Sequence, residues 1–157
     1  MKIKLIVVAK TEEAYLKAGI DIYLKRIIHY VPFEIVEIPA IKNAGKISVK
    51  TQKQLEGALI LKHLDNTDAL VLLDEQGKEF TSVGYSNFLG KKLNSGIKTL
   101  TFVIGGPFGF SEAVYAKATD KMALSQMTFS HQMVRLFFVE QLYRALNIIH
   151  GGAYHHE

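Results

Sequence analysis

The sequence predicts an α/β fold, a parallel sheet with helices on both of its faces. Short apolar runs, typical of strands buried on both faces, alternate along the chain with longer segments whose apolar residues recur at helical spacing. Such an alternation indicates parallel strands joined by crossover helices. The length of 157 residues suits one domain, and the sequence contains no internal repeat and no long linker, so we interpret residues 1–157 as a single domain.

Local patterns predict the first four elements. The apolar run at residues 4–8 predicts a buried strand. Thr11 is expected to cap the next helix, because the two glutamates that follow it suit the positive end of a helix dipole. Residues 33–38 alternate in polarity between two prolines and predict a second strand. Thr51 fits a capping box that opens a helix running to about residue 64.

The second half of the chain repeats this alternation, with three more strands and three more helices. The strands are apolar runs, and each helix begins at or beside a serine, with Ser82 expected to cap the first of them. Two glycines after residue 150 end the last helix. The expected strands cover residues 69–73, 101–104 and 122–124, and the expected helices cover residues 83–93, a short stretch from Ser111, and residues 130–149.

Composition excludes several classes of protein. The chain has no cysteine, which excludes a disulfide framework and a thiolate zinc site, and its histidines lack metal-ligand spacing, so we expect no metal dependence. The N-terminal apolar run is too short for a secretory signal or a membrane helix. We therefore expect a cytoplasmic protein that does not contact membranes.

One segment is more basic than the rest of the chain. Residues 39–53 hold Lys42, Lys46, Lys50 and Lys53 and no acidic residue, within a chain of net charge +4. The ordinary interpretation is a solvated loop followed by a helix start. The alternative is a surface that contacts nucleic-acid phosphates and loses affinity as salt rises.

Three segments lie where ligands of parallel α/β sheets bind, beyond the carboxyl ends of the strands: residues 73–77, 105–109 and 125–131. The glycine segment lacks the lysine of a P-loop and comes too late in the chain for a dinucleotide fingerprint. It is either a tight turn or a loop where missing side chains let a flat ligand approach the backbone. Met127 and Phe129 in the last segment either pack on the core or wall a pocket.

Four short motifs stand in a distinctive order along the chain: I-G-G at residues 104–106, L-S-Q-M-T-F-S-H at 124–131, Y-R-A at 143–145 and Y-H at 154–155. Their order and spacing resemble the RlmH family, which belongs to the SPOUT class of methyltransferases. The likeness also includes the opening M-K-I-K-L, so it spans the chain. Ser130 departs from the proline usual in the family, and His156 stands where relatives often carry arginine or lysine.

The resemblance implies S-adenosylmethionine as cofactor and methylation of N3 of a pseudouridine in the decoding-region stem-loop of 23S ribosomal RNA, on the ribosome. It also implies a homodimer and a C-terminal trefoil knot, which the periodicity of the sequence does not itself predict. The family's positions that bind S-adenosylmethionine fall here on Leu73, Gly105, Leu124, Ser125, Gln126, Met127, Thr128 and Phe129.

The candidate catalytic residues are Arg135, Tyr154 and His155. A uracil-like N3 carries a proton, so a general base would add about 10²–10⁴-fold to the rate. Arg135 suits phosphate binding or charge stabilisation better than proton removal, and His131 either serves as a base or caps the last helix. The resemblance places Tyr154 and His155 beside the substrate, so we expect the tail from Gly152 to recognise RNA and not to hold the cofactor.

Other interpretations stay open at this point. The last helix is apolar nearly all round and needs two covers, which a second copy or other helices of the same chain would supply. A SPOUT enzyme acting on transfer RNA would share the cofactor segment but not the Y-R-A and Y-H motifs. A flavodoxin-like or receiver-type module, and a ribosome-binding factor without activity, are the non-enzymatic alternatives.

Overall fold

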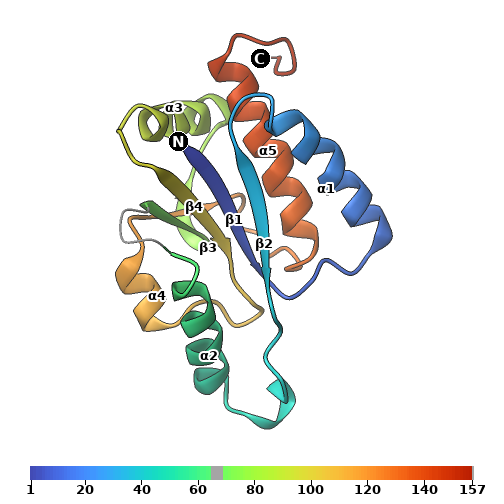
Figure 1. Ribbon diagram of the computed structural model, residues 1–157, viewed down its shortest axis with the longest axis vertical. Coiled ribbons are helices and arrows are strands. Elements are labelled where there is room, and N and C mark those ends of the chain that lie inside the picture. The colour runs from blue at the N-terminus through green and yellow to red at the C-terminus, as the bar shows by residue number, and fades with distance from the viewer. Residues whose placement is uncertain (65–68, 157) are drawn as a thin grey trace.

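The computed structural model describes residues 1–64 and 69–156 and confirms the predicted class of fold. Its strands are Lys2–Val8 (β1), Phe33–Ile38 (β2), Ala69–Glu79 (β3), Thr99–Ile104 (β4) and Asp120–Ala123 (β5). Its helices are Ala14–Ile27 (α1), Val49–Leu61 (α2), Ser82–Leu93 (α3), Glu112–Lys117 (α4) and Met133–Ile149 (α5), with a 3-10 turn at Ala44–Lys46 (η1). The strands form one sheet in the order β2-β1-β4-β3-β5, and every neighbouring pair is parallel (Figure 1).

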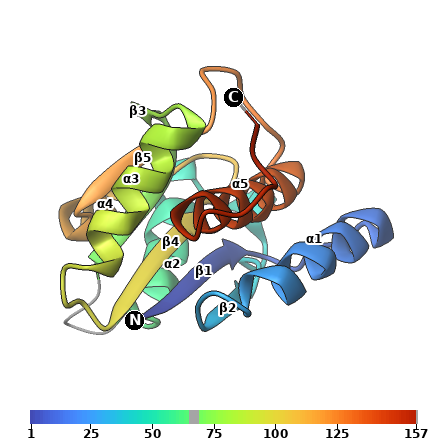
Figure 2. The same ribbon diagram turned by 90° about the horizontal axis from the view of Figure 1, so that it is seen from above.

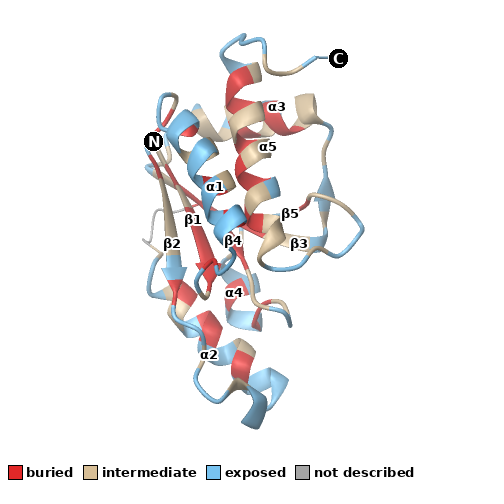
Figure 3. Cartoon of the chain, turned by 90° about the vertical axis from the view of Figure 1, so that its right-hand side faces the viewer, coloured by how far each residue is buried: buried red, intermediate tan, exposed pale blue. Residues whose placement is uncertain are grey.

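The sheet carries a hydrophobic core on each face, because successive strand residues point to opposite sides. Leu5 and Val7 of β1 face a core completed by α1, α3 and α5. Ile6 and Val8 face a second core completed by α2 and α4. Figure 3 shows buried residues along the sheet and on the sides of the helices that meet it. The expected three-layer arrangement is thereby confirmed.

Helix α5 lies between α1 and α3, on the same face of the sheet (Figure 2). Phe138, Val139, Leu142 and Leu146 are fully buried there, at 0% exposure. Both covers that this helix requires therefore come from its own chain, the sheet on one side and the flanking helices on the other. Its apolar circumference alone does not demand a second copy.

Three helix starts differ from the sequence-based expectation. Thr11 does not cap α1, because its backbone N–H donates to Glu37 Oε2 at 2.6 Å and its hydroxyl accepts a hydrogen bond from Arg135. Helix α2 is capped instead by Ser48, whose Oγ accepts from the Thr51 backbone N–H at 3.1 Å. Helix α3 is capped by the residue before Ser82, Thr81, whereas α4 begins after Ser111 as expected.

Strand β3 continues past its expected end. Met122 of β5 pairs with both Leu73 and Lys78, so the residues between them form a bulge out of the ladder. Gly77 makes this possible, because a Cβ at that position would lie 2.6 Å from the Met122 backbone nitrogen. The bulge places residues 74–77 at the carboxyl edge of the sheet, where bulges often border functional sites.

The buried hydroxyl of Tyr85 generates a prediction about stability. Tyr85 is 4% exposed, and its Oη has no hydrogen-bond partner within residues 1–64 and 69–156. Burial also raises the pKa of Tyr85. Because an unpaired buried hydroxyl is costly, Tyr85→Phe should raise the free energy of unfolding by about 1 kcal/mol in chemical denaturation.

The matched control is Tyr30→Phe. The Tyr30 hydroxyl accepts a hydrogen bond from Asn147 Nδ2 at 3.1 Å, so its loss should lower the free energy of unfolding by about 1 kcal/mol. Destabilisation by both substitutions to the same extent would show that the Tyr85 hydroxyl is paired.

Candidate functional site

A pocket of about 540 Å³ opens at the carboxyl ends of β3, β4 and β5. Its walls come from the β3 bulge, the glycine loop after β4 and the segment that joins β5 to α5. The three strand-end segments singled out from the sequence thus meet in one cavity. Its volume lies within the range of about 300–1,000 Å³ typical of small-molecule sites.

Most of the expected cofactor residues line this pocket. Ser125 Oγ accepts a hydrogen bond from the Met127 backbone N–H at 3.0 Å, and the resulting turn leaves Gln126 exposed at its tip. Gln126 is therefore the expected residue that does not line the cavity. Those that do are Leu73, Gly105, Leu124, Ser125, Met127, Thr128 and Phe129.

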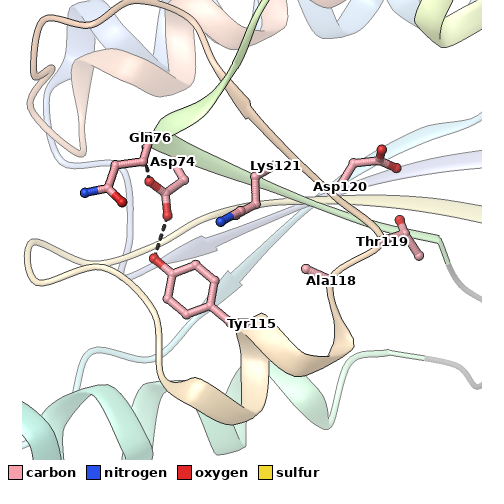
Figure 4. A pocket seen from close by; sticks show the side chains of 7 residues that line it. All are labelled: Asp74, Gln76, Tyr115, Ala118, Thr119, Asp120 and Lys121. Carbon is pink, nitrogen blue, oxygen red and sulfur yellow. Dashed lines mark hydrogen bonds between the residues drawn. The ribbon is translucent and has the colours of Figure 1, made fainter.

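Both carboxylates of the β3 bulge accept hydrogen bonds, one from the segment between β5 and α5 and one from α4. Glu75 Oε2 accepts a hydrogen bond from Thr128 Oγ1 at 2.8 Å, and Asp74 Oδ2 accepts one from Tyr115 Oη at 2.5 Å. Burial, and then the hydrogen bond to Asp74 and its charge, raise the pKa of Tyr115 to about 12, so this phenol is a donor at neutral pH. Figure 4 shows Tyr115 and Asp74 pointing toward each other in an adjoining pocket of about 520 Å³.

The glycine loop packs closely against other parts of its own chain. A Cβ at Gly106 would lie 2.7 Å from the Glu56 Oε2 of α2, and one at Gly105 would lie 3.0 Å from the Phe110 ring. The Gly109 backbone N–H donates to the Gly106 carbonyl at 3.2 Å, with φ of +82° at Gly109. The loop is thus a tight turn, and it also presents backbone to the pocket; both interpretations of the sequence describe part of it.

The electrostatics of the pocket favour a ligand that carries positive charge. Among the described residues that line it, Asp74 and Glu75 are carboxylates, and none is a lysine or arginine. Apolar walls come from Leu73, Phe129 and Val134. A phosphate group would find no cationic partner here, whereas a flat apolar group attached to a cation would find both its requirements.

Arg135 lies behind the pocket wall, 1% exposed and outside the lining. Its Nε donates to the His131 carbonyl at 3.0 Å, its Nη1 to the Ala9 carbonyl at 3.0 Å and to Thr11 Oγ1 at 2.9 Å, and its Nη2 to the Val8 carbonyl at 2.6 Å. Burial lowers the pKa of Arg135, opposed by nearby carboxylates. The guanidinium therefore joins the end of β1 to the start of α5, and its donors are used inside the chain.

A second polar side chain strengthens the same junction. Gln132 Nε2 donates to the Lys10 carbonyl at 3.0 Å, and Gln132 Oε1 accepts from the Glu12 backbone N–H at 2.9 Å. Ala9, in the turn that Arg135 and Gln132 both contact, has φ of +67°, a left-handed conformation that costs a non-glycine residue about 1 kcal/mol or more. Two side chains at the start of α5 thus hold a strained turn in place.

The tail is folded back onto the far end of α5. The Tyr154 backbone N–H donates to Asn147 Oδ1, and Tyr154 Oη donates to Glu140 Oε1, both at 3.0 Å. The Tyr154 ring also meets the Tyr143 ring, with centroids 4.8 Å apart. Figure 1 shows this end of the chain at the opposite end of α5 from the carboxyl ends of β1 and β2. Glu157, the last residue of the expected tail, lies outside the described residues.

Tyr154 and His155 do not line the pocket of their own chain. Burial, together with Tyr23 and Glu140, raises the pKa of Tyr154, so its phenol stays protonated. Arg144 Nη1 lies 3.3 Å from His155 Nδ1, and because arginine only donates, Nδ1 is the acceptor in this contact.

Several lining residues were not among the expected site residues. Asp74 lay in the segment 73–77 that the sequence singled out but was given no role of its own, and Tyr115, on α4, gave no signal in the sequence. His131 was considered as a base and does line the pocket. Over residues 1–64 and 69–156, no three metal-ligating side chains gather in one place. In that part of the chain, no helix combines the length and apolarity needed to cross a bilayer.

Comparisons with known proteins agree with one another. The family model described as "Predicted SPOUT methyltransferase" matches residues 1–155. Proteins named "Ribosomal RNA large subunit methyltransferase H" from Flavobacterium johnsoniae and Parabacteroides distasonis are 57% and 55% identical to this chain over 157 residues, which is 100% of both partners in each comparison. The protein of that name from Bacteroides thetaiotaomicron is 49% identical over the same span. The resemblance drawn from the motifs is thereby confirmed.

Replacing Arg135 tests its structural role. Arg135→Met removes the donor of four hydrogen bonds, of which those to the Val8 carbonyl and to Thr11 Oγ1 are buried, so the free energy of unfolding should fall by about 3 kcal/mol in chemical denaturation. Arg26→Met is the control: its exposed guanidinium lies over the Tyr23 and Tyr143 rings at 5.5 Å, a contact whose loss should cost about 1 kcal/mol at most. Equal losses would contradict the junction described for Arg135.

Proposed function

Because the chain belongs to the SPOUT methyltransferase family and is a full-length relative of ribosomal RNA large subunit methyltransferase H, we propose that it methylates N3 of a pseudouridine in 23S ribosomal RNA, with S-adenosylmethionine as methyl donor. The chain is a methyltransferase by family. The observation that supports the cofactor is the pocket with apolar walls, open glycine backbone and two carboxylates. Action on the ribosome implies a cytoplasmic enzyme.

The lining residues suit each part of S-adenosylmethionine. We propose that Phe129, Leu73 and Leu124 hold the adenine, and that the backbone at Gly105 and along residues 125–128 supplies its hydrogen bonds, Gln126 contributing through its backbone alone. Asp74 and Glu75 offset the positive charges of the cofactor. When bound, the cofactor supplies a methyl group already activated by its positively charged sulfur. The family's trefoil knot, formed by the C-terminal part of the chain, belongs to the same proposal.

The protein has to align the pyrimidine and receive the N3 proton, which leaves as the nitrogen gains its methyl group. His131 is the imidazole that lines the pocket of the same chain, and we propose it as the base. Tyr154 is held protonated, and the Nδ1 of His155 faces Arg144, so both suit RNA binding better than proton removal. Arg135 acts through position, by fixing the start of α5.

A homodimer reconciles the tail with a role at the substrate. Tyr154 and His155 do not line the pocket of their own chain, and Tyr154 packs on α5 at Glu140 and Asn147, so we propose that the pair acts at the pocket of a second copy. Exposed apolar side chains surround the first half of α5, with Met127 at 77%, Tyr15 at 62% and Phe137 at 43% exposure. We propose this surface as part of a two-fold interface.

The function is tested by methyl transfer to ribosomes from a strain that lacks the modification. Tritium from labelled S-adenosylmethionine should enter 23S ribosomal RNA, and mass mapping should place one methyl group on N3 of a pseudouridine. Methylation of transfer RNA, or of a different base, would contradict the proposal.

Phe129→Ala, which removes an aromatic wall, should weaken cofactor affinity at least about tenfold in calorimetry.

The control for the cofactor site is Phe88→Ala. Phe88 is also a half-buried aromatic residue, but it lies on α3 and outside the pocket lining. Its loss should leave the affinity for S-adenosylmethionine unchanged. Equal weakening by both substitutions would mean that the effect of Phe129→Ala comes from general destabilisation.

Deletion of residues 152–157 tests the tail. The truncated protein should remain a dimer by light scattering and keep its cofactor affinity, because the tail packs on the far end of α5, while methyl transfer to ribosomes should fall at least about a hundredfold. Mixing the truncated protein with the Phe129→Ala protein should restore activity. In a mixed dimer the truncated copy supplies an intact pocket, and the Phe129→Ala copy supplies an intact tail. A monomer, or mixtures without activity, would contradict a tail that acts across the dimer.

A further inference from the structure

Four lysines form a cationic surface that the cofactor pocket does not use. Lys42, Lys46 and Lys50 are exposed and Lys53 is half-buried, on the segment that contains η1 and the first turn of α2. Within residues 1–64 and 69–156, none of the four takes part in an ion pair. Their charges are therefore available to a partner.

Two of the four, Lys50 and Lys53, lie on the side of α2 that leads to the glycine loop. Residues three and four apart share a helix face, so Lys50, Lys53, Glu56 and Gly57 follow one another along one side. Glu56 meets the loop at Gly106, and Gly57 lies so close to Ser111 that a Cβ there would be 2.3 Å from the serine Oγ. The two lysines therefore continue the loop-facing side of α2 outward into solvent.

The lysine surface also lies at the same end of the molecule as the pocket. Figure 1 shows η1 and the start of α2 extending beyond the arrowheads of β1 and β2, at the carboxyl edge of the sheet where the pocket opens. The amino-terminal end of α2 adds the positive end of its helix dipole to the same region. Positive charge thus gathers beside a pocket whose own charged groups include two carboxylates.

We propose that Lys42, Lys46, Lys50 and Lys53 bind the phosphate backbone of the RNA substrate and hold it while the target base enters the neighbouring pocket. This inference rests on the proposed function, because it takes RNA as the substrate. The division of charge supports it: carboxylates line the cofactor pocket, and the polyanion is held outside. Phosphate contacts of this kind position a nucleic acid without reading its sequence.

The test compares two variants that each lose four positive charges. The first replaces all four surface lysines with glutamine. The second does the same to four exposed lysines at the amino-terminal side of the sheet, in or beside the last turns of α2, α3 and α4 and before β4. These control positions are Lys62, Lys91, Lys98 and Lys117, the last of them at the end of α4.

Binding of a fluorescent RNA stem-loop is measured from about 50 to 200 mM salt, and methyl transfer is measured with ribosomes. For the first variant, the slope of log affinity against log salt should fall by about 0.7 per lysine, and the KM for ribosomes should rise at least about tenfold. Its kcat and S-adenosylmethionine affinity should match the unchanged protein, and the control variant should keep its slope and KM.

Equal slopes and KM values for the two variants would overturn the inference, as would a loss of cofactor affinity in the first. The proposed function fails separately. If the unchanged protein methylates ribosomes and the first variant keeps its KM, the enzyme assignment stands and the lysine surface does not. If the unchanged protein binds the stem-loop through these lysines but methylates no ribosomal RNA, the surface stands and the assignment does not.

Discussion

The buried guanidinium of Arg135 joins two parts of the chain that are more than a hundred residues apart, and the pocket depends on that junction. One wall of the pocket is the segment from β5 to α5. The Arg135 guanidinium donates a hydrogen bond to the His131 carbonyl, near the end of this segment, and another to the Val8 carbonyl at the end of β1. Removing a guanidinium from water is costly unless its donors are satisfied, and here four of its five N–H groups donate to oxygen. Most of the hydrogen-bonding capacity of Arg135 is therefore used inside the chain, at this edge of the sheet.

Much of the fold follows from local pattern. Strand β2 begins and ends where its alternation and flanking prolines predicted, and α4 begins after its expected cap, because both signals depend on neighbouring residues alone. Thr11 shows the limit of such reasoning. Its hydroxyl suits a helix cap equally well, but a contact 124 residues away along the chain takes it instead. The bulge in β3 was invisible for the same reason, since Gly77 is required by the backbone of β5.

The candidate site also has a part that the sequence predicts and a part that only the folded chain reveals. The rule that ligands bind at the carboxyl ends of parallel strands was enough to select the segments that form the pocket. The rule could not separate Gln126 from its neighbours, because the turn between Ser125 and Met127 decides which side chain points outward. Nor could the residue type of Arg135 show whether it binds a phosphate group or forms buried hydrogen bonds within its own chain, since both roles need the same N–H donors. For Tyr154 and His155, motif likeness gave no information about their distance from the pocket of their own chain, which they do not line.

The bulge in β3 has a consequence for how this enzyme can vary. The strand pairs with β5 before and after the excursion, at Leu73 and again at Lys78, so the excursion is anchored at both ends. The acidic side chains at 74 and 75 can therefore be exchanged one for one during evolution or engineering without disturbing the pairing on either side. Gly77 is the position that cannot vary in this way, because a Cβ there would lie 2.6 Å from the Met122 backbone nitrogen and would push β5 away. The chemistry of this wall can change while its backbone path stays constant.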